Sequence, residues 1–196
     1  MVQLNLCIDI DGTITEAYDW IPRANQYFNA NIKPTDVTVY EIHKALGVES
    51  EAYEEFYHEY GEVLHEEVSI RKGAKEAINK LYKDHQIHIV TAREDKMRDI
   101  TLSWFAGNQV PYHNLFLLGS HYKVAKAMEL SCDLFLEDRL ENALQLAAAG
   151  FNVLLMDCHY NQGPLPAGIS RVKNWFEVYD YIRSLEADRS KYRIAT

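Results

Sequence analysis

Short apolar segments alternate with helical segments through most of this chain, and this alternation constrains the possible fold more than any other feature. Apolar, β-rich runs predict strands at residues 2–10, 86–92, 114–119, 132–137 and 151–156. Strands that alternate with helices require right-handed crossovers, which produce a parallel sheet with helices on both faces. The sequence therefore predicts the α/β fold class with a doubly wound parallel sheet.

The segments between and after these strands have helical spacing. Helices are expected at residues 74–85, 94–107, from 121 onward, 140–150 and 174–186. A loop rich in proline and glycine is expected at 161–168. Residues 161–172 and the last ten residues of the chain show no pattern that predicts a structure or a role.

The alternation is interrupted after the first strand by a region of a different kind. Helical spacing continues there through residues 22–30, 39–47 and 50–68, and the last of these segments is long and acidic. An insert at this point lies over the carboxyl edge of such a sheet, where ligands bind. We therefore predict a core made of residues 1–14 and 72–196, with a helical cap at 15–71 that acts as a lid.

Composition excludes several classes of partner. The chain has 196 residues, of which 29 are acidic and 20 are basic, and its net charge of −9 disfavours binding to a nucleic-acid polymer. Cys7, Cys132 and Cys158 lack the spacing of a metal site or a disulfide framework, which favours buried thiols in a reducing compartment. No segment resembles a signal peptide or a membrane span, so a cytoplasmic location is expected, without a membrane partner. The sequence does not indicate an oligomeric state.

The segment Asp9-Ile10-Asp11-Gly12-Thr13 follows the first apolar strand. If the strand stays extended, Asp9 and Asp11 lie on one side of it. Neighbouring carboxylates in a partly dry site repel, so a proton or a cation must accompany them, and Mg²⁺ takes such oxygen ligands together with phosphate. Gly12 permits a sharp turn whose amides are suited to phosphate oxygens. The alternative is an ordinary Asp-Gly turn, which does not explain Asp9.

A second candidate is Thr91, which ends the strand at 86–92 just before Ala92 and Arg93. A hydroxyl and the amides of this turn could bind a phosphate. The spacing of Thr91 and Glu94 also fits a capping box, which requires no function. Arg93 is a further candidate cation, although an exposed arginine is the more common case.

Two more candidates follow later strands. Lys123 lies at the start of a helix, where the helix dipole disfavours a cation, so an anionic partner is expected unless this is an ordinary solvated lysine. Glu137 and Asp138 follow the apolar strand at 132–137 and could supply oxygen ligands to Mg²⁺. The alternative for Asp138 is a helix N-cap, which leaves Glu137 unexplained. The ordered series of carboxylates, hydroxyl, cation and carboxylates predicts phosphoryl transfer.

These motifs resemble those of the haloacid dehalogenase superfamily of phosphohydrolases, which has a Rossmann-like core. The resemblance covers residues 4–158 and rests on DIDGT at 9–13, Thr91, Lys123 and the acidic pair at 137–138. Within the superfamily the chain looks most like the 5'(3')-deoxyribonucleotidase family and related bacterial nucleotidases. The core size, the short helical insert and the segment LFLEDRLENA at 134–143 carry this narrower likeness. Eukaryotic members differ in having an aspartate pair at 137–138 and a hydrophobic residue in place of Thr13.

The resemblance implies a role for each of these residues. Asp9 would be the nucleophile and a Mg²⁺ ligand, and Asp11 would serve as acid, then as base, while its carbonyl oxygen binds the metal. Asp138 would be a further ligand, with Glu137 beside it, and which of the two binds directly stays open. Phosphate would be bound by Gly12, Thr91, Ala92 and Lys123.

The insert is rich in aromatic rings, which can stack on a nucleobase or pack against one another. They are Tyr18, Trp20, Tyr27, Phe28, Tyr40, Tyr53, Phe56, Tyr57 and Tyr60. Tyr18 and Trp20, close to the DIDGT motif, are the rings we expect to meet substrate. His58 and His65 are seven residues apart, too far for a chelating pair, and are expected at the surface.

Three hypotheses follow for the function. The first is a Mg²⁺-dependent phosphomonoesterase acting on nucleoside monophosphates through an aspartyl-phosphate. The second is a phosphatase or mutase for another small phosphometabolite, such as a sugar phosphate. The third is a non-catalytic module that senses phosphate or a metal, against which Asp11 and the lid-like insert argue.

Overall fold

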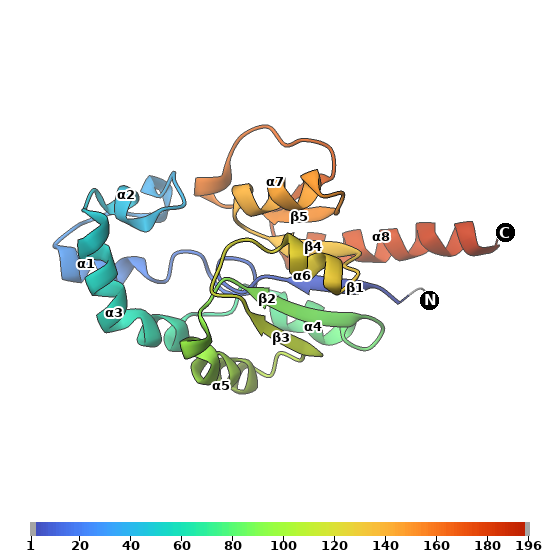
Figure 1. Cartoon of the computed structure of the whole chain (residues 1–196), viewed down its shortest axis with the longest axis horizontal. Coiled ribbons are helices and arrows are strands. Elements are labelled where there is room, and N and C mark those ends of the chain that lie inside the picture. The colour runs from blue at the N-terminus through green and yellow to red at the C-terminus, as the bar shows by residue number, and fades with distance from the viewer. Residues whose placement is uncertain (1–2, 195–196) are drawn as a thin grey trace.

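The computed structural model describes residues 3–194 of the chain, with side chains described as far as residue 187. Its centre is a six-stranded sheet in the order β3-β2-β1-β4-β5-β6, and every strand pairing is parallel (Figure 1). The strands are β1 (Asn5–Ile8), β2 (Gln86–Thr91), β3 (Asn114–Leu117), β4 (Leu134–Glu137), β5 (Val153–Met156) and β6 (Ile169–Val172). The predicted doubly wound parallel sheet is confirmed.

Neighbouring residues of a strand point to opposite sides of the sheet, and here both sides carry apolar side chains. Helices therefore cover both faces of the sheet. Leu6 and Ile8 belong to the apolar cluster that includes α4, α5 and α8, whereas Cys7 belongs to the cluster of α6 and α7. All three cysteines are free and buried, as predicted. The helices are α4 (Ala74–Leu81), α5 (Arg98–Asn108), α6 (Val124–Glu129), α7 (Leu140–Ala148) and α8 (Trp175–Ile194), with short 3-10 helices η2 (Asp95–Met97) and η3 (His159–Asn161). None of the helices in residues 3–194 is long and apolar enough to cross a membrane.

The order of the strands places the two motifs of acidic residues next to each other. β1 pairs with β2 on one side and with β4 on the other, so Leu6 has Ile87 and Leu134 as its two neighbours. The chain winds outward from β1 through β2 to β3, and then from β4 to β6 in the opposite direction. Such a reversal leaves a crevice at the carboxyl ends of the two central strands, where ligands bind in this class of fold.

The region between β1 and α4 forms helices that lie beyond the carboxyl edge of the sheet (Figure 1). An antiparallel bridge between Thr15 and Ile70 joins its two ends, and no strand occurs in residues 16–69, all of which are described. The indole of Trp104 in α5 donates a hydrogen bond of 2.8 Å to the carbonyl of Val68. The helices are α1 (Ile21–Phe28), η1 (Pro34–Asp36), α2 (Ile42–Leu46) and α3 (Ser50–Glu67). This agrees with a helical insert, while its division from the core at residues 15 and 71 stays a prediction.

Two parts of the sequence prediction require correction. The sheet has a sixth strand, β6, inside the segment 161–172 that shows no sequence pattern. This four-residue strand lies at the edge of the sheet and includes Ser170 and Arg171, so it lacks the continuous apolar run of a central strand. α8 likewise extends to Ile194, into the last ten residues, and residues 195–196 lie outside the described part.

Candidate active site

The buried side chain of Lys123 joins two acidic strand ends into one cluster. Its Nζ lies 2.5 Å from Oδ1 of Asp9, which follows β1, and 3.0 Å from Oε2 of Glu137, the last residue of β4. Lys123 is only 2% exposed. Burial alone would lower the pKa of this lysine, but the two carboxylates outweigh burial and raise its pKa, so the ammonium group stays charged. The expectation of an anionic partner for Lys123 is confirmed.

The second acid of the pair, Asp138, is held by a different set of groups. The hydroxyl of Tyr160 donates to Oδ2 of Asp138, and Nδ2 of Asn161 donates to its carbonyl oxygen at 2.6 Å. Both oxygens of Glu137 are already engaged, by Lys123 and by the amide of Asn142. Arg139, not Asp138, is the N-cap residue of α7, so the capping explanation of Asp138 is wrong.

The cluster holds more negative than positive charge. Oxygen atoms of Asp9, Glu137 and Asp138 lie within 4.8 Å of one another, and Lys123 is the cation in contact with this group. Burial, reinforced by neighbouring carboxylates, raises the pKa of Glu137 to about 8 and that of Asp138 to about 7. Such carboxylates ionise fully only when another cation is present, and hard oxygen donors suit Mg²⁺. The residues present therefore fit a magnesium site.

The turn after β1 brings Gly12 against this cluster. The amides of Thr13, Ile14 and Thr15 all donate to the carbonyl of Ile10, so the chain turns sharply. Gly12 has a φ of +76°, and a Cβ there would collide with the Asp138 carboxylate and the Tyr160 hydroxyl. Any other residue at position 12 would thus displace the Asp138 carboxylate, which belongs to the acidic cluster.

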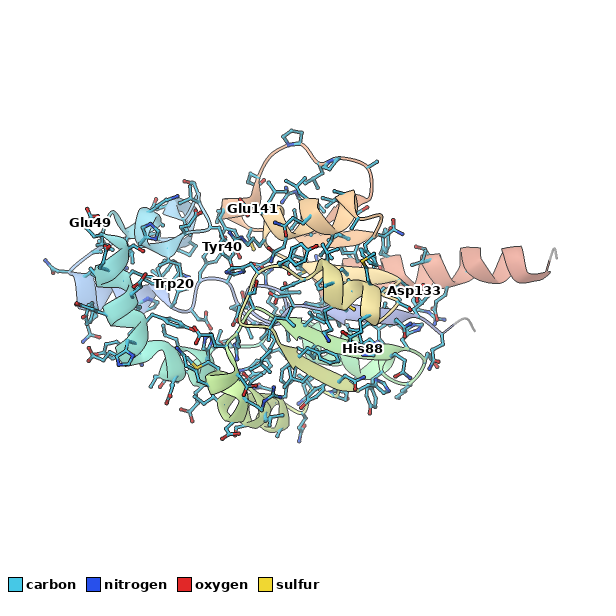
Figure 2. All side chains as sticks on the ribbon, in the orientation of Figure 1. Trp20, Tyr40, Glu49, His88, Asp133 and Glu141 are labelled. Atoms are coloured by element: carbon cyan, nitrogen blue, oxygen red, sulfur yellow. The ribbon has the colours of Figure 1, made fainter. Side chains whose placement is uncertain are left out.

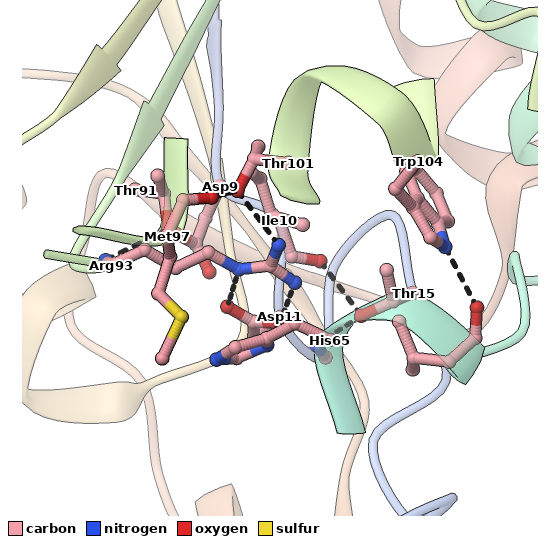
Figure 3. A network of polar contacts seen from close by, with 12 residues as sticks. Asp9, Ile10, Asp11, Thr15, His65, Thr91, Arg93, Met97, Thr101 and Trp104 are labelled. Atoms are coloured by element: carbon pink, nitrogen blue, oxygen red, sulfur yellow. Dashed lines mark hydrogen bonds and ion pairs between the residues drawn. The ribbon is translucent and has the colours of Figure 1, made fainter. Parts of the chain in front are cut away.

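Asp11 pairs with a different cation from the one that Asp9 contacts. Its two carboxylate oxygens accept hydrogen bonds of 2.8 Å and 2.6 Å from Nε and Nη2 of Arg93, as Figure 3 shows. Burial opposes ionisation, but the guanidinium of Arg93 holds the pKa of Asp11 well below its usual range. The sequence argument that placed Asp9 and Asp11 on one side of an extended strand is wrong, since β1 ends at Ile8.

The turn after β2 supplies Thr91, whose hydroxyl accepts a hydrogen bond of 3.2 Å from the amide of Arg93. The capping box with Glu94 does not form, because η2 begins at Asp95 with no side-chain cap. Arg93 is 5% exposed, so the expectation of an exposed arginine is wrong as well.

These groups line one cavity of about 610 Å³ between the insert and the sheet. The predicted site residues of the core that line it are Asp9, Asp11, Gly12, Thr91, Ala92, Lys123, Glu137 and Asp138. Trp20 and Tyr40 lie between the insert helices and the sheet in Figure 2, and both line this cavity. Tyr18 is not among the described lining residues; its hydroxyl accepts a hydrogen bond from the amide of His159. The structure thus brings all eight of these predicted site residues together around one cavity. Of the two rings expected to meet substrate, Trp20 lines this cavity.

Several residues of the site escaped the sequence analysis. Tyr53 and Tyr57 line the cavity from α3, and their four-residue spacing could have shown that they share a helix face. His65 is 13% exposed and lies 3.5 Å from Asp11, so its expected surface position is wrong, whereas His58 is exposed. Tyr160 had no sequence signal, since nothing links it to β4 in the chain. The sequence left open whether the rings of the insert stack on a nucleobase or pack against one another. Packing against one another is found for Tyr27, Phe28, Phe56 and Tyr60.

Comparison with known proteins identifies the family. Residues 3–189 match the family model for 5' nucleotidase, deoxy (pyrimidine), cytosolic type C protein. The chain belongs to this family. A protein of Clostridium acetobutylicum named as a nucleotidase is 50% identical over 185 residues, which cover 94% of this chain and 96% of that protein. YqfW of Bacillus subtilis is 34% identical over 182 residues, 92% of this chain and 94% of that protein. This nucleotidase is accordingly a hydrolase of phosphoric monoesters.

Solved structures confirm the fold of this nucleotidase. A haloacid dehalogenase-like hydrolase of Streptococcus pneumoniae has a TM-score of 0.70 at 11% identity, covering 92% of this chain and 98% of that one. YfnB of Bacillus subtilis, solved with magnesium bound, has a TM-score of 0.63 at 15% identity and covers 93% and 100%. The chain therefore shares the fold of these haloacid dehalogenase-like hydrolases.

Proposed function

We propose that this nucleotidase hydrolyses nucleoside monophosphates in the cytoplasm, in a Mg²⁺-dependent reaction that passes through a phosphoryl group on Asp9. The observation that carries the proposal is the contact of 2.5 Å between Asp9 and Lys123, at the end of β1 and inside the shared cavity. A carboxylate is a usable nucleophile toward phosphate only where nearby cations offset the negative charge of both groups. Asp9 contacts this cation and belongs to the cluster that fits a metal, and unlike Glu137 it has no second side-chain donor among its described hydrogen bonds.

The proposed metal ligands are the side chains of Asp9 and Asp138 and the carbonyl oxygen of Asp11. Glu137 has both oxygens engaged by Lys123 and Asn142, which favours Asp138 as the direct ligand and gives Glu137 a supporting role. When bound, Mg²⁺ would stabilise the negative charge that the phosphoryl group carries in the transition state.

In the first step, an oxygen of Asp9 bonds to phosphorus and the bond between phosphorus and the ester oxygen breaks. The leaving oxygen takes a proton from the carboxyl group of Asp11. Asp11 is ionised beside Arg93, so before this step it must take a proton from solvent, which the negative charge of a bound phosphate favours. Lys123 and the turn residues Gly12, Thr91 and Ala92 hold the phosphate oxygens in this scheme.

In the second step, Asp11, now ionised, takes a proton from a water molecule. The water oxygen bonds to phosphorus, and the bond between phosphorus and Asp9 breaks. Inorganic phosphate is released, Asp9 is again a free carboxylate, and Asp11 has regained from water the proton that it gave to the leaving oxygen. Asp11 thus acts as acid and then as base without any net change.

The insert supports a nucleotide as the substrate. Trp20, Tyr53 and Tyr57 line the same cavity as the acidic cluster, and aromatic rings can stack on a base. The Trp20 indole donates a hydrogen bond of 3.0 Å to the carbonyl of Ala17, which fixes the ring. Membership of a nucleotidase family favours this substrate over a sugar phosphate, and it favours hydrolysis over a non-catalytic sensor.

The test is release of inorganic phosphate from a panel of nucleoside monophosphates and sugar phosphates, with Mg²⁺ or with EDTA. We expect release from nucleotides that requires Mg²⁺ and is lost in Asp9→Asn. Equal rates for nucleotides and sugar phosphates would contradict the substrate class. Transfer of the phosphoryl group to another position of the product, with little free phosphate, would indicate a mutase.

A further inference from the structure

One contact links the insert directly to the acid–base residue of the core. His65, near the carboxyl end of α3, places its Nδ1 atom 3.5 Å from Oδ1 of Asp11 (Figure 3). The histidine side chain is 13% exposed and lines the shared cavity. A side chain of the insert therefore reaches the residue that the proposed reaction uses for both proton transfers.

The imidazole is held in this orientation from behind. The hydroxyl of Tyr57, just over two helical turns earlier in α3, lies 2.8 Å from Nε2 of His65, and the two rings are nearly perpendicular at 81°. An ionised carboxylate only accepts hydrogen bonds, so Nδ1 must carry the proton that faces Asp11. In the neutral imidazole, Nε2 then accepts from Tyr57. Burial raises the pKa of Tyr57 to about 12, so its hydroxyl keeps the proton that it donates.

The opposite side of Asp11 is held by the core. Arg93 binds both carboxylate oxygens, and its Nη1 donates a further hydrogen bond of 3.1 Å to the hydroxyl of Thr101 in α5. The Thr101 hydroxyl in turn donates to the carbonyl of Met97 at 2.7 Å. These partners of Arg93 lie outside the insert helices, whereas the contact with His65 comes from α3 of the insert.

We propose that His65 is a positioning residue through which closure of the insert fixes the carboxyl group of Asp11 for proton transfer to the leaving oxygen. This inference rests on the proposed function, because it assigns His65 a part in that reaction. Without His65, Asp11 would keep Arg93 as its anchor. The second anchor, from α3, contacts Oδ1 and so restricts the orientation of the carboxyl group. Acid–base assistance then depends on the insert.

The test uses two kinds of ester that differ in their need for a proton. The nucleoside of a nucleoside monophosphate would leave as an unstable alkoxide unless an acid protonates its oxygen. p-Nitrophenyl phosphate releases p-nitrophenolate, a stable anion that needs no proton. In His65→Ala we expect kcat for the nucleotide to fall by about tenfold to a hundredfold, part of what a general acid contributes. For p-nitrophenyl phosphate we expect a change of less than about threefold.

Matched variants separate positioning from folding. His65→Asn keeps a donor near the position of Nδ1 and should recover part of the nucleotide rate, while His58→Ala, exposed on the same helix, should match the wild type. Tyr57→Phe removes the hydroxyl behind His65 and should give a smaller loss with the same dependence on the leaving group, even if His65→Ala fails to fold. Equal losses on both esters, or no loss on either, would overturn the inference and leave the proposed function intact. Phosphate release that survives Asp9→Asn would instead overturn the proposed function.

Discussion

The carboxyl edge of the sheet and the helical insert line the same cavity but are built in opposite ways. Lys123 and Glu137 are 2% and 1% exposed and bind each other directly at a strand end and a helix start. Trp20 and Tyr53, in contrast, are partly exposed and reach the cavity from separate segments of the insert. From this difference we expect the reaction to depend on groups fixed by the sheet, and substrate selection to depend on how the insert is folded.

The largest effect should come from removing the cation of the sheet edge. Lys123→Met leaves Asp9 and Glu137 without their common partner, and we expect kcat to fall by roughly 10²-fold or more on every phosphate ester. The matched control is Lys126→Met, a partly exposed lysine on the same helix that pairs with Glu129. Both variants are compared with the wild type by their steady-state rates on nucleotides and on p-nitrophenyl phosphate. A loss confined to nucleotides would contradict the separation of the two regions.

A smaller and more selective effect is expected in the insert. Trp20→Ala removes a candidate stacking surface, worth on the order of 1–3 kcal/mol per base, so KM for nucleoside monophosphates should rise roughly tenfold. Its kinetics with p-nitrophenyl phosphate should change little. Tyr122→Ala, at a position that is 57% exposed, serves as the control. An unchanged KM for nucleotides would show that Trp20 only packs within the insert.

The smallest expected effect is a change of stability with pH, caused by Glu137 and Asp138 at the carboxyl edge of the sheet. Glu137 and Asp138 have raised pKa values of about 8 and about 7 in the folded protein, so the folded state binds more protons than the unfolded state between about pH 5 and pH 8. Stability without metal should therefore fall as pH rises through this window. Mg²⁺ binds the ionised acids, so its stabilising effect should grow with pH.

Thermal unfolding with EDTA or Mg²⁺ measures this dependence. We expect Tm in EDTA to drop by several degrees, given about 2–4 °C per kcal/mol for a chain of this length. Asp138→Asn should reduce both the decrease of Tm with pH in EDTA and the increase of Tm that Mg²⁺ causes. A Tm in EDTA that rises from about pH 5 to about pH 8 would contradict the charge balance of the cluster.

The same contrast explains what the sequence could predict. Asp9, Thr91 and Glu137 each end an apolar strand, and parallel strands bring such ends together whatever the loops do. The expected sheet and the residues of its edge were therefore predictable. β6 was not, because an edge strand of four residues with Ser170 and Arg171 has no continuous apolar run.

Other parts of the site depend on tertiary contacts that no spacing along the chain reveals. Tyr160 and Asn161 follow β5 in sequence, yet they bind Asp138 after β4. Arg93 would be a surface residue by its type, but the turn at Ile10 sends Asp11 toward it. Of the two rings, Trp20 is among the residues that line the cavity and Tyr18 is not, although Tyr18 is nearer to the DIDGT motif in sequence.

The most direct test of the account is to look for the phosphoryl group on Asp9. Protein mixed with substrate and Mg²⁺ is quenched in acid during turnover, digested, and analysed by mass spectrometry for a phosphorylated peptide. The account predicts a phosphoryl group on Asp9 in the wild type and none in Asp9→Asn. Steady phosphate release from a folded wild-type protein whose phosphoryl group is found on another residue would contradict it.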